Sequence, residues 1–413
     1  MKTLLKKSIL IAMLAFIDLS ANAQWLQTST PPGGSVRAIA IIGTNLFAGC
    51  TNGGVYFSSD DGTTWVQRNG AFPTMEVYSL VANNSDLYAG TGGSFGGGVY
   101  KSSDNGLTWT NITPTGTNTS SNVGALAVNG TDIYAGTFGG GVVFKSSLNG
   151  INTTSWSVFN TGLPDKTIRS FALSGSNILA GTYGDGVWIS PTNSANWSST
   201  SGMSTSADYI QTLAVSGSNV FAGNISGTPV LYRSTDSGLT WTQSSTSVFA
   251  NKPVYAIINN GTDIYAGTEG EGAFLSTDNG VTWTSYNIGF KNSLGNWYCN
   301  QINIRSFAFI GNKIFAGTDC GIWKLDMSTG IMEVNEPSDV SIFPNPSNGV
   351  LSIKSEIKIS NIKVISTLGE QIYSAQINSD KTDIDLSKQQ KGIYFYQLQS
   401  DKKILRTGKI IIK

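Results

Sequence analysis

The chain has 413 residues, of which 13% are charged and 48 are glycine, and it contains no histidine. The lack of histidine excludes Ser-His-Asp triads, Cys-His dyads and histidine-ligated zinc or iron, so any catalysis would rest on Asp, Glu, Tyr, Arg or Lys. The formal net charge is zero, but residues 24–337 carry 12 Lys and Arg against 18 Asp and Glu. This acidic balance argues against a nucleic-acid partner, and the composition is typical of a turn-rich all-β protein.

The first 23 residues have the pattern of a signal peptide. Three lysines precede an apolar run from Ile9 to Ile17, and Ala21-Asn22-Ala23 provides small residues for cleavage. The apolar run is about half of the ~20 residues that a membrane span needs, and no later segment is long and apolar enough to span a membrane. We therefore expect an exported mature chain that begins at Gln24 and has no transmembrane segment.

An internal repeat organises residues 24–334. A phrase close to VxxLAVxGTDIYAGT recurs seven times, with 41 to 50 residues between successive Ala-Gly pairs, and each unit reads as four short strands. A four-stranded unit cannot cover both of its faces, but neighbours arranged around an axis can, and the period falls in the range of propeller blades. The sequence therefore predicts an all-β fold, a seven-bladed β-propeller followed by a small C-terminal β-sandwich.

The start of the mature chain is expected to close this ring. The seventh repeat has no Trp-containing fourth strand after GIWKLDMS, whereas QWLQTST at residues 24–30 resembles the fourth strand TWVQRNG of the first repeat. We expect Trp25 to Thr28 to supply the outermost strand of the seventh blade, because a linear array would leave its end blades exposed.

A second motif, Ser-x-Asp-x-Gly-x-Thr-Trp, lies between the third and fourth strands of four repeats and resembles the Asp-box of bacterial neuraminidase repeats. We expect a structural hairpin in which Asp accepts N–H bonds, Gly supplies unusual dihedrals and Trp packs between sheets. One hairpin offers too few oxygens to hold calcium unaided, so neither a metal nor another cofactor is expected. The motif residues are Asp60, Gly62 and Trp65; Asp104, Gly106 and Trp109; Asp236, Gly238 and Trp241; Asp278, Gly280 and Trp283.

One position of the repeat suggests a ligand site. The second residue of each innermost strand is expected near the mouth of the propeller channel, at the end opposite the Asp-box hairpins. Arginine, tyrosine and glutamine there could bind a carboxylate, sulfate or sugar, because guanidinium groups bind oxyanions in bidentate fashion. Alternatively, each arginine satisfies carbonyls between blades. The residues at this position, called the ring position below, are Arg37, Tyr78, Gly124, Arg169, Gln211, Tyr255 and Arg305.

Loops after the second strands add acidic residues to the same end, with Phe138 and Tyr183 as possible stacking platforms. Paired carboxylates could support glycoside cleavage, and sialidases share both Asp-boxes and arginines. However, the chain has no Phe-Arg-Ile-Pro motif, and sialidases have six blades rather than seven. Binding is therefore favoured over catalysis, and ordinary solvated loop charges are the alternative. The acidic residues are Asp185, Glu269, Glu271 and Asp319.

The chain has three cysteines, Cys50, Cys299 and Cys320, and the repeat alignment places all three near the seam between the first and seventh blades. We expect a disulfide between Cys299 and Cys320 in an oxidising compartment, with Cys50 left as a free thiol. A three-thiol metal site is the alternative, but it lacks a fourth ligand.

After a linker at residues 335–340, residues 341–413 read as alternating short strands of a small sandwich. They resemble the type A sorting domain of type IX secretion in Bacteroidetes, with Ser366 near a place where that family often has aspartate. The resemblance implies that the type IX machinery is a partner and that this domain is usually removed after export. An accessory carbohydrate-binding sandwich is the alternative. The matching residues are Pro344, Asn345, Pro346 and Gly349, then Gly392 and Tyr394.

These features predict a monomeric, secreted or surface-attached propeller that binds an extracellular glycan or protein ligand. A glycoside hydrolase or lyase that uses the acidic loop residues is one alternative. An assembly-factor-like protein scaffold is another, because the repeats encode the blade and not its ligand.

Overall fold

The computed structural model describes residues 24–70, 76–93, 97–115, 122–203, 208–228, 230–244, 247–291, 297–299, 302–327, 340–355, 359–366, 371–377, 381–400 and 403–413. It contains two compact units, one within residues 24–328 and one in the C-terminal part of the chain. Over the described residues the secondary structure is strand apart from one short 3-10 turn, η1 (Ser247–Phe249). No helix in this part of the chain has the length and hydropathy to cross a membrane.

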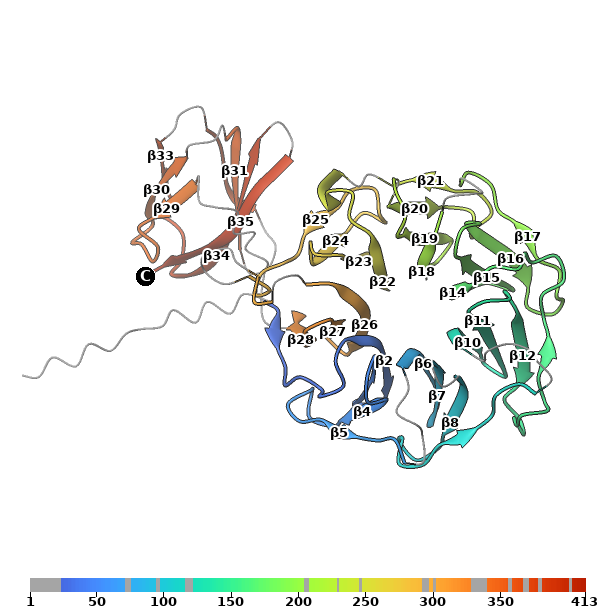
Figure 1. The fold of residues 1–413 in the computed structure, drawn as a ribbon. Coiled ribbons are helices and arrows are strands. Elements are labelled where there is room, and N and C mark those ends of the chain that lie inside the picture. The colour runs from blue at the N-terminus through green and yellow to red at the C-terminus, as the bar shows by residue number, and fades with distance from the viewer. Residues whose placement is uncertain are drawn as a thin grey trace, which may run out of the picture. The chain divides into compact units, whose positions relative to one another are not determined.

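The first unit consists of seven four-stranded antiparallel sheets arranged in a ring (Figure 1). The innermost strands contact one another in cyclic order, from β2 with β6 round to β26 with β2. From inner to outer strand, the blades are β2 (Val36–Ile42), β3 (Asn45–Cys50), β4 (Val55–Ser58), β5 (Val66–Gln67); β6 (Glu76–Asn83), β7 (Asp86–Gly92), β8 (Gly98–Ser102), β9 (Thr110–Asn111); β10 (Val123–Asn129), β11 (Asp132–Thr137), β12 (Val143–Ser147), β13 (Ser157–Val158); β14 (Ile168–Ser174), β15 (Asn177–Thr182), β16 (Val187–Pro191), β17 (Ser198–Ser199); β18 (Ile210–Ser216), β19 (Asn219–Asn224), β20 (Leu231–Ser234), β21 (Thr242–Gln243); β22 (Val254–Asn260), β23 (Asp263–Thr268), β24 (Ala273–Ser276), β25 (Thr284–Ser285); and β26 (Ile304–Ile310), β27 (Lys313–Thr318), β28 (Gly321–Asp326), β1 (Leu26–Gln27).

The seventh blade takes its outermost strand from the start of the mature chain. Leu26 pairs with Lys324 and Gln27 with Trp323, so β1 is the fourth strand of the sheet that β26 begins. The Trp25 side chain is 1% exposed and stacks on Phe290 with 4.8 Å between ring centroids. The seven-bladed fold and the predicted closure of its ring are therefore confirmed.

The repeated Ala-Gly pair marks the place where neighbouring blades approach most closely. A Cβ on Gly49 would lie 2.5 Å from Val77 of the next blade, and one on Gly267 would lie 2.5 Å from Ile304. At all seven pairs the nearest atoms include the residue just before the ring position on the next innermost strand. Only glycine leaves room for this contact, which explains why the pair recurs.

The Asp-box forms the same hairpin in each of its four complete copies. In the first blade, Thr64 donates its backbone N–H to Asp60 Oδ1 at 2.9 Å and its hydroxyl to Oδ2 at 2.7 Å. Gly62 donates its N–H to the Ser58 hydroxyl at 2.9 Å. In the third blade, where Leu148 stands two residues after Ser146, the amide oxygen of Asn152 instead accepts the N–H of Thr154 at 2.8 Å. The hairpin of this blade is therefore stabilised by a different side chain.

The tryptophans after these hairpins connect each blade to the one before it. All seven indole N–H groups, including that of Trp25, donate to an oxygen on or beside the outer strand of the preceding blade, at 2.6–3.2 Å. Blades three and four keep this bond although their Asp-boxes are incomplete. The donor and acceptor pairs are Trp65 with Ser29, Trp109 with Arg68, Trp156 with Ile112, Trp197 with Phe159, Trp241 with Thr200, Trp283 with Ser244 and Trp25 with Tyr286.

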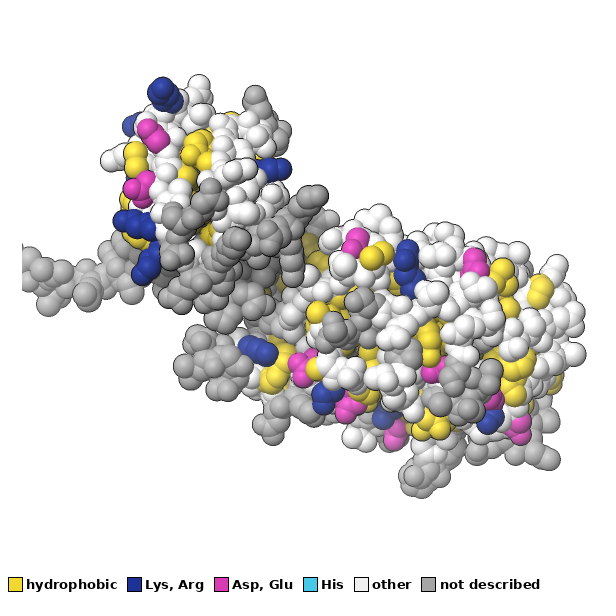
Figure 2. All heavy atoms as spheres, turned by 90° about the horizontal axis from the view of Figure 1, so that it is seen from above, with side chains coloured by type: hydrophobic (Ala, Val, Ile, Leu, Met, Phe, Trp, Pro, Cys, Tyr) yellow, Lys and Arg dark blue, Asp and Glu magenta, His cyan; other side chains and the backbone are white. Residues whose placement is uncertain are grey.

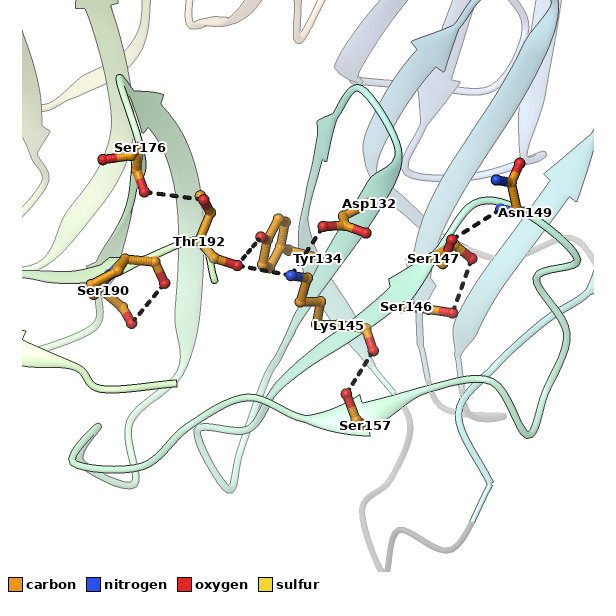
Figure 3. A network of polar contacts seen from close by, with 11 residues as sticks. Asp132, Tyr134, Lys145, Ser146, Ser147, Asn149, Ser157, Ser176, Ser190 and Thr192 are labelled. Atoms are coloured by element: carbon orange, nitrogen blue, oxygen red, sulfur yellow. Dashed lines mark hydrogen bonds and ion pairs between the residues drawn. The ribbon is translucent and has the colours of Figure 1, made fainter. Parts of the chain in front are cut away.

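Polar networks at the Asp-box end reinforce the same interfaces. Between the third and fourth blades, Lys145 donates to the Thr192 carbonyl at 2.8 Å and pairs with Asp132 at 3.0 Å (Figure 3). The Tyr134 hydroxyl donates to the same carbonyl at 3.1 Å. These contacts join neighbouring blades, so this end of the propeller has a structural role.

The Asp-box carboxylates should make the stability of the propeller depend on pH in acid. Hydrogen bonds from the Thr64 backbone and hydroxyl and from Ser58 lower the pKa of Asp60 from 3.8 to about 2. Burial opposes the corresponding bonds at Asp236, but its pKa is also lowered to about 2. Because the folded pKa lies below the unfolded one, this stability is present above about pH 4 and is lost as the pH falls through about 2.

We expect Asp60→Asn and Asp236→Asn to weaken that dependence, since the amide oxygen still accepts the backbone N–H of the hairpin but the amide does not titrate over this range. Urea unfolding of the wild type and both variants at pH 5, 4, 3 and 2 measures it. Parallel loss of stability in all three proteins would show that other groups cause acid unfolding.

The C-terminal unit is a two-sheet sandwich. One sheet contains β29 (Val340–Phe343), β30 (Val350–Ser355) and β33 (Lys381–Asp385). The other contains β32 (Gln371–Gln376), β31 (Asn361–Ser366), β34 (Gly392–Ser400) and β35 (Lys403–Ile412). Aliphatic and tyrosine side chains from both sheets form its core, among them Ile353, Ile362, Val364, Ile384 and Leu398.

The sorting-motif residues hold the ends of this sandwich together. Asn345 donates its side-chain amide to the Lys409 carbonyl at 2.6 Å and accepts the Ile411 N–H at 2.9 Å, which fastens the Pro344-Asn345-Pro346 segment to the last strand. Gly349 has a φ of +99°, and a Cβ there would lie 2.5 Å from Ser387. Gly392 begins β34, and Tyr394 on the same strand donates its hydroxyl to the Gln390 carbonyl at 2.7 Å.

Candidate functional site

Every ring-position residue is the extra residue of a β-bulge. In the first blade Val36 pairs with Cys50 and Ala38 with Gly49, so Arg37 between them has no partner on β3. The same shift in register occurs at the ring position of all seven innermost strands. A bulge turns its side chain away from the direction that regular alternation would give it. The bulges were not predicted, although the recurrence of polar residues at a single strand position is the signal that could have revealed them.

Over the first four blades, the ring position and the loops beside it form one connected cluster of alternating aromatic rings and guanidinium groups. The Arg37 guanidinium lies 5.2 Å from the Tyr78 ring, and the Tyr78 and Phe138 rings are 4.7 Å apart. Arg169 then lies between Phe138 at 4.5 Å and Tyr183 at 5.1 Å. The two residues expected to be platforms, Phe138 and Tyr183, are therefore part of the cluster.

Glycine at the ring position of the third blade belongs to the same arrangement. A Cβ on Gly124 would lie 2.1 Å from the Phe138 ring, so the ring occupies the space that a side chain would otherwise take. In the second blade, a Cβ on Gly92 would lie 2.4 Å from the Tyr78 ring. These two glycines let loop and strand aromatics lie flat against the backbone.

Little negative charge neutralises the two arginines of this cluster. Arg37 approaches one carboxylate, that of Glu76, at 3.9 Å, while Arg169 has no ion-pair partner among the described residues. The Nε atoms of both are buried and have no hydrogen-bond partner there. Burial, together with the nearby charge of Arg37, lowers the pKa of Arg169 below its ordinary value. Both features favour an anion beside these arginines.

The ring position of blades six and seven is different because its charges are already paired. Arg305 donates to both oxygens of Asp319, at 2.9 and 3.0 Å, and its guanidinium lies 4.3 Å from the Tyr255 ring. Asn303 also donates to Asp319, at 2.6 Å, and the Tyr255 hydroxyl donates to Glu269 at 2.7 Å. Four of the predicted site residues thus form two bonded pairs within the fold, Arg305 with Asp319 and Tyr255 with Glu269.

Two of the predicted acidic residues, Asp319 and Asp185, pair with basic side chains. Burial tends to raise the pKa of Asp319, but hydrogen bonds from Arg305 and Asn303 outweigh it and leave the pKa lowered, which suits an ionised ligand to arginine rather than a general acid. Asp185 forms an ion pair with Lys166 at 3.6 Å. Glu271 lies in the loop after β23, where its backbone carbonyl accepts from Asn287 at 2.8 Å. Gln211 occupies the ring position of the fifth blade.

The cysteines near the seam are arranged as a disulfide and a buried thiol. Cys299 and Cys320 are bonded, with 6.6 Å between their Cα atoms, and this bond ties the segment before β26 to the loop that carries Asp319. Cys50 is buried, and that burial raises the pKa of its thiol to about 12. Such a thiol is a poor nucleophile and metal ligand. Within the described residues, no cluster of His, Cys, Asp and Glu has the arrangement of a metal site.

Charged side chains are few on the side of the propeller that Figure 2 shows. Lysines, arginines, aspartates and glutamates lie there among uncharged side chains and backbone, with groups of opposite sign close to one another along the lower edge. On the side shown, charge of either sign does not gather into a large patch.

Comparison with known proteins identifies the C-terminal unit. Residues 341–413 match the family described as Secretion system C-terminal sorting domain. This unit is a sorting domain. It directs the chain through the type IX system to the cell surface or the extracellular space. A comparison with curated protein sequences finds no match.

Among solved structures, the similar ones are β-propellers. YCF48 from Cyanidioschyzon merolae is 15% identical with a TM-score of 0.57, over 74% of this chain and 100% of that one. PorZ, a surface component of the type-IX secretion system of Porphyromonas gingivalis, is 14% identical with a TM-score of 0.57, over 93% and 60%. The GH74 enzyme of Niastella koreensis is 14% identical with a TM-score of 0.59, over 94% and 74%. At these identities the likeness concerns the fold alone.

Proposed function

We propose that this secreted propeller is a binding module, and that the end carrying the ring position takes up an extracellular glycan or protein ligand. The observation that supports this best is the cluster of Arg37, Tyr78, Phe138, Arg169 and Tyr183, in which both arginines lie against aromatic rings and keep an unpaired Nε donor. The lysines on the third strands of blades two and three, by contrast, pair with carboxylates, Lys101 with Asp86 and Lys145 with Asp132.

The proposal is tested by a glycan and surface-protein array probed with the mature chain from Gln24. We expect the triple variant Arg37→Ala, Arg169→Ala, Arg305→Ala to lose at least about tenfold in affinity for any ligand found, a cost of about 1.4 kcal/mol. Its melting temperature and near-UV circular dichroism report whether the propeller stays folded. The control is Arg233→Ala, which removes an arginine that bonds Asn219 away from the ring position. Equal binding by the wild type and the triple variant would place the ligand elsewhere.

A glycoside hydrolase or lyase is the alternative, since Glu269 and Asp319 lie beside the ring position. Release of reducing ends or unsaturated sugars from the same glycans would reveal such an activity, and Glu269→Gln should abolish it. A protein scaffold resembling an assembly factor would instead retain a protein on the array without altering any glycan.

A further inference from the structure

Resting on that proposed function, we infer that the ligand is an acidic sugar, a pyranose that carries a carboxylate, and that Arg169 and Arg37 bind its charge while Arg305 does not. The ring position and the loops beside it thus form two unequal parts. The binding part comprises Arg37, Tyr78, Phe138, Arg169 and Tyr183, called the arginine–aromatic cluster below. The other part consists of residues around Arg305 that are already paired.

The first support is the unequal neutralisation of charge. Arg305 donates two hydrogen bonds to the carboxylate of Asp319. A ligand that displaced this carboxylate would leave Asp319 half-buried and without its main partner. Arg169 has no ion-pair partner among the described residues, and its Nε is buried. Since burial of an unpaired guanidinium is costly, an incoming anion gains most at Arg169.

The second support is the geometry of the aromatic rings around Arg169. Phe138 and Tyr183 lie 4.5 and 5.1 Å from its guanidinium carbon, as in cation–π contacts. Stacking engages the faces of a guanidinium and leaves its N–H groups pointing outward in the plane. The rings therefore hold Arg169 in place without using the donors that a carboxylate needs, so binding requires little reordering.

The third support is an exposed aromatic platform beside the charge. Tyr183 is 42% exposed and stacks on Tyr209 with centroids 4.1 Å apart and 24° between the rings. Gly184 has a φ of +113°, and a Cβ there would lie 3.1 Å from the Tyr209 ring, so the loop folds closely over the pair. Tyr209 and Arg169 both lie against the Tyr183 ring, so the C–H groups of a pyranose would pack along the exposed edge of this ring, while a carboxylate on the same sugar would reach Arg169.

The experiment uses the purified mature chain and matched sugar probes. The probes are tetragalacturonate, a hyaluronan hexasaccharide and sialyllactose, each with its carboxyl methyl ester, and binding is measured by calorimetry at low and physiological salt. We expect at least one acid to bind at least tenfold more tightly than its ester, and to bind less tightly as salt rises.

The variants locate the site. For the acid that binds, we expect Arg169→Ala and Arg37→Ala to lose at least tenfold in affinity, Tyr183→Ala to lose several-fold, and Arg305→Ala to stay within threefold of the wild type. Arg169→Lys keeps the charge but not the planar stacked fork, so it should recover only part of the affinity. If Arg169→Ala does not fold, Arg169→Lys and the pairs of acid and ester still test the inference.

Several results would overturn it. Equal binding of acid and ester would show that the carboxylate charge does not contribute to affinity. A loss of affinity with Arg305→Ala as large as that with Arg169→Ala would remove the distinction between the two parts. Tighter binding of a peptide with a free C-terminal carboxylate than of every acidic sugar would assign the site to proteins. Binding of a neutral glycan alone, abolished by the triple ring variant, would refute the acidic-sugar inference and leave the proposed function standing. Binding that no ring substitution alters would refute both.

Discussion

Trp25→Ala is expected to lower the free energy of unfolding of the propeller by about 3–5 kcal/mol, the usual cost of truncating a large buried aromatic side chain. The Trp25 ring is 1% exposed, stacks on Phe290 at 4.8 Å and donates its indole N–H to the Tyr286 carbonyl at 2.8 Å. Its neighbours Leu26 and Gln27 form the strand that completes the seventh blade. Loss of the Trp25 side chain therefore weakens the attachment of the strand that closes the ring, in addition to removing a packing contact. Urea unfolding followed by tryptophan fluorescence measures the change.

The matched control is Trp156→Ala. Trp156 also donates to the preceding blade, at 2.6 Å from the Ile112 carbonyl, but it is only half-buried and joins two blades that are consecutive in the chain. We expect a smaller loss there, because all four strands of each of those blades are consecutive in the chain, whereas the strand that completes the seventh blade comes from the other end of the propeller sequence. Equal losses in the two variants would mean that ring closure adds nothing beyond the local packing.

Deletion of residues 338–413 is expected to stop export at the periplasm, with the mature propeller absent from the medium and the cell surface. The deleted residues include the sorting domain that the type IX system reads. Immunoblots of periplasm, surface and medium from a type IX secreting host measure the outcome. Normal appearance of the truncated chain in the medium would refute the dependence on this domain.

Substitutions at two glycines test whether the type IX machinery recognises the folded sorting domain or its local sequence motif. Gly349→Ala places a side chain at a φ of +99° and 2.5 Å from Ser387, so it should disturb the sandwich and reduce export severalfold. Gly392→Ala meets nothing within 4 Å and should be exported normally. If Gly392→Ala failed to be exported while Gly349→Ala was secreted, the machinery would read the local motif rather than the fold.

Much of the architecture could be predicted because it follows from short sequence motifs that recur along the chain. Seven Ala-Gly pairs, each required by the contact with the next blade, indicate the number of blades, and Trp25 outside the repeats identifies the strand that closes the ring. Four Asp-boxes mark one end of the blades as structural. Both kinds of signal depend on backbone geometry, which recurs with the repeat.

The candidate site was predicted as a set of positions but not as a set of interactions. Arg37, Arg169 and Arg305 hold equivalent positions in the repeat and are alike in sequence. Only the tertiary structure separates them, since Asp319 neutralises Arg305 while Phe138 and Tyr183 flank Arg169 without pairing its charge. These partners come from different loops, and no pattern along the chain states which loop reaches which strand.

By itself, then, the sequence determined the blade, the number of blades, the closure of the ring and the domain that directs export. Each of these follows from residues close in the chain or repeated at a fixed period. The tertiary structure alone decided which arginines remain available to a ligand. The charge state and freedom of a guanidinium depend on what lies within about 4 Å of it, and in a propeller those neighbours come from adjacent blades.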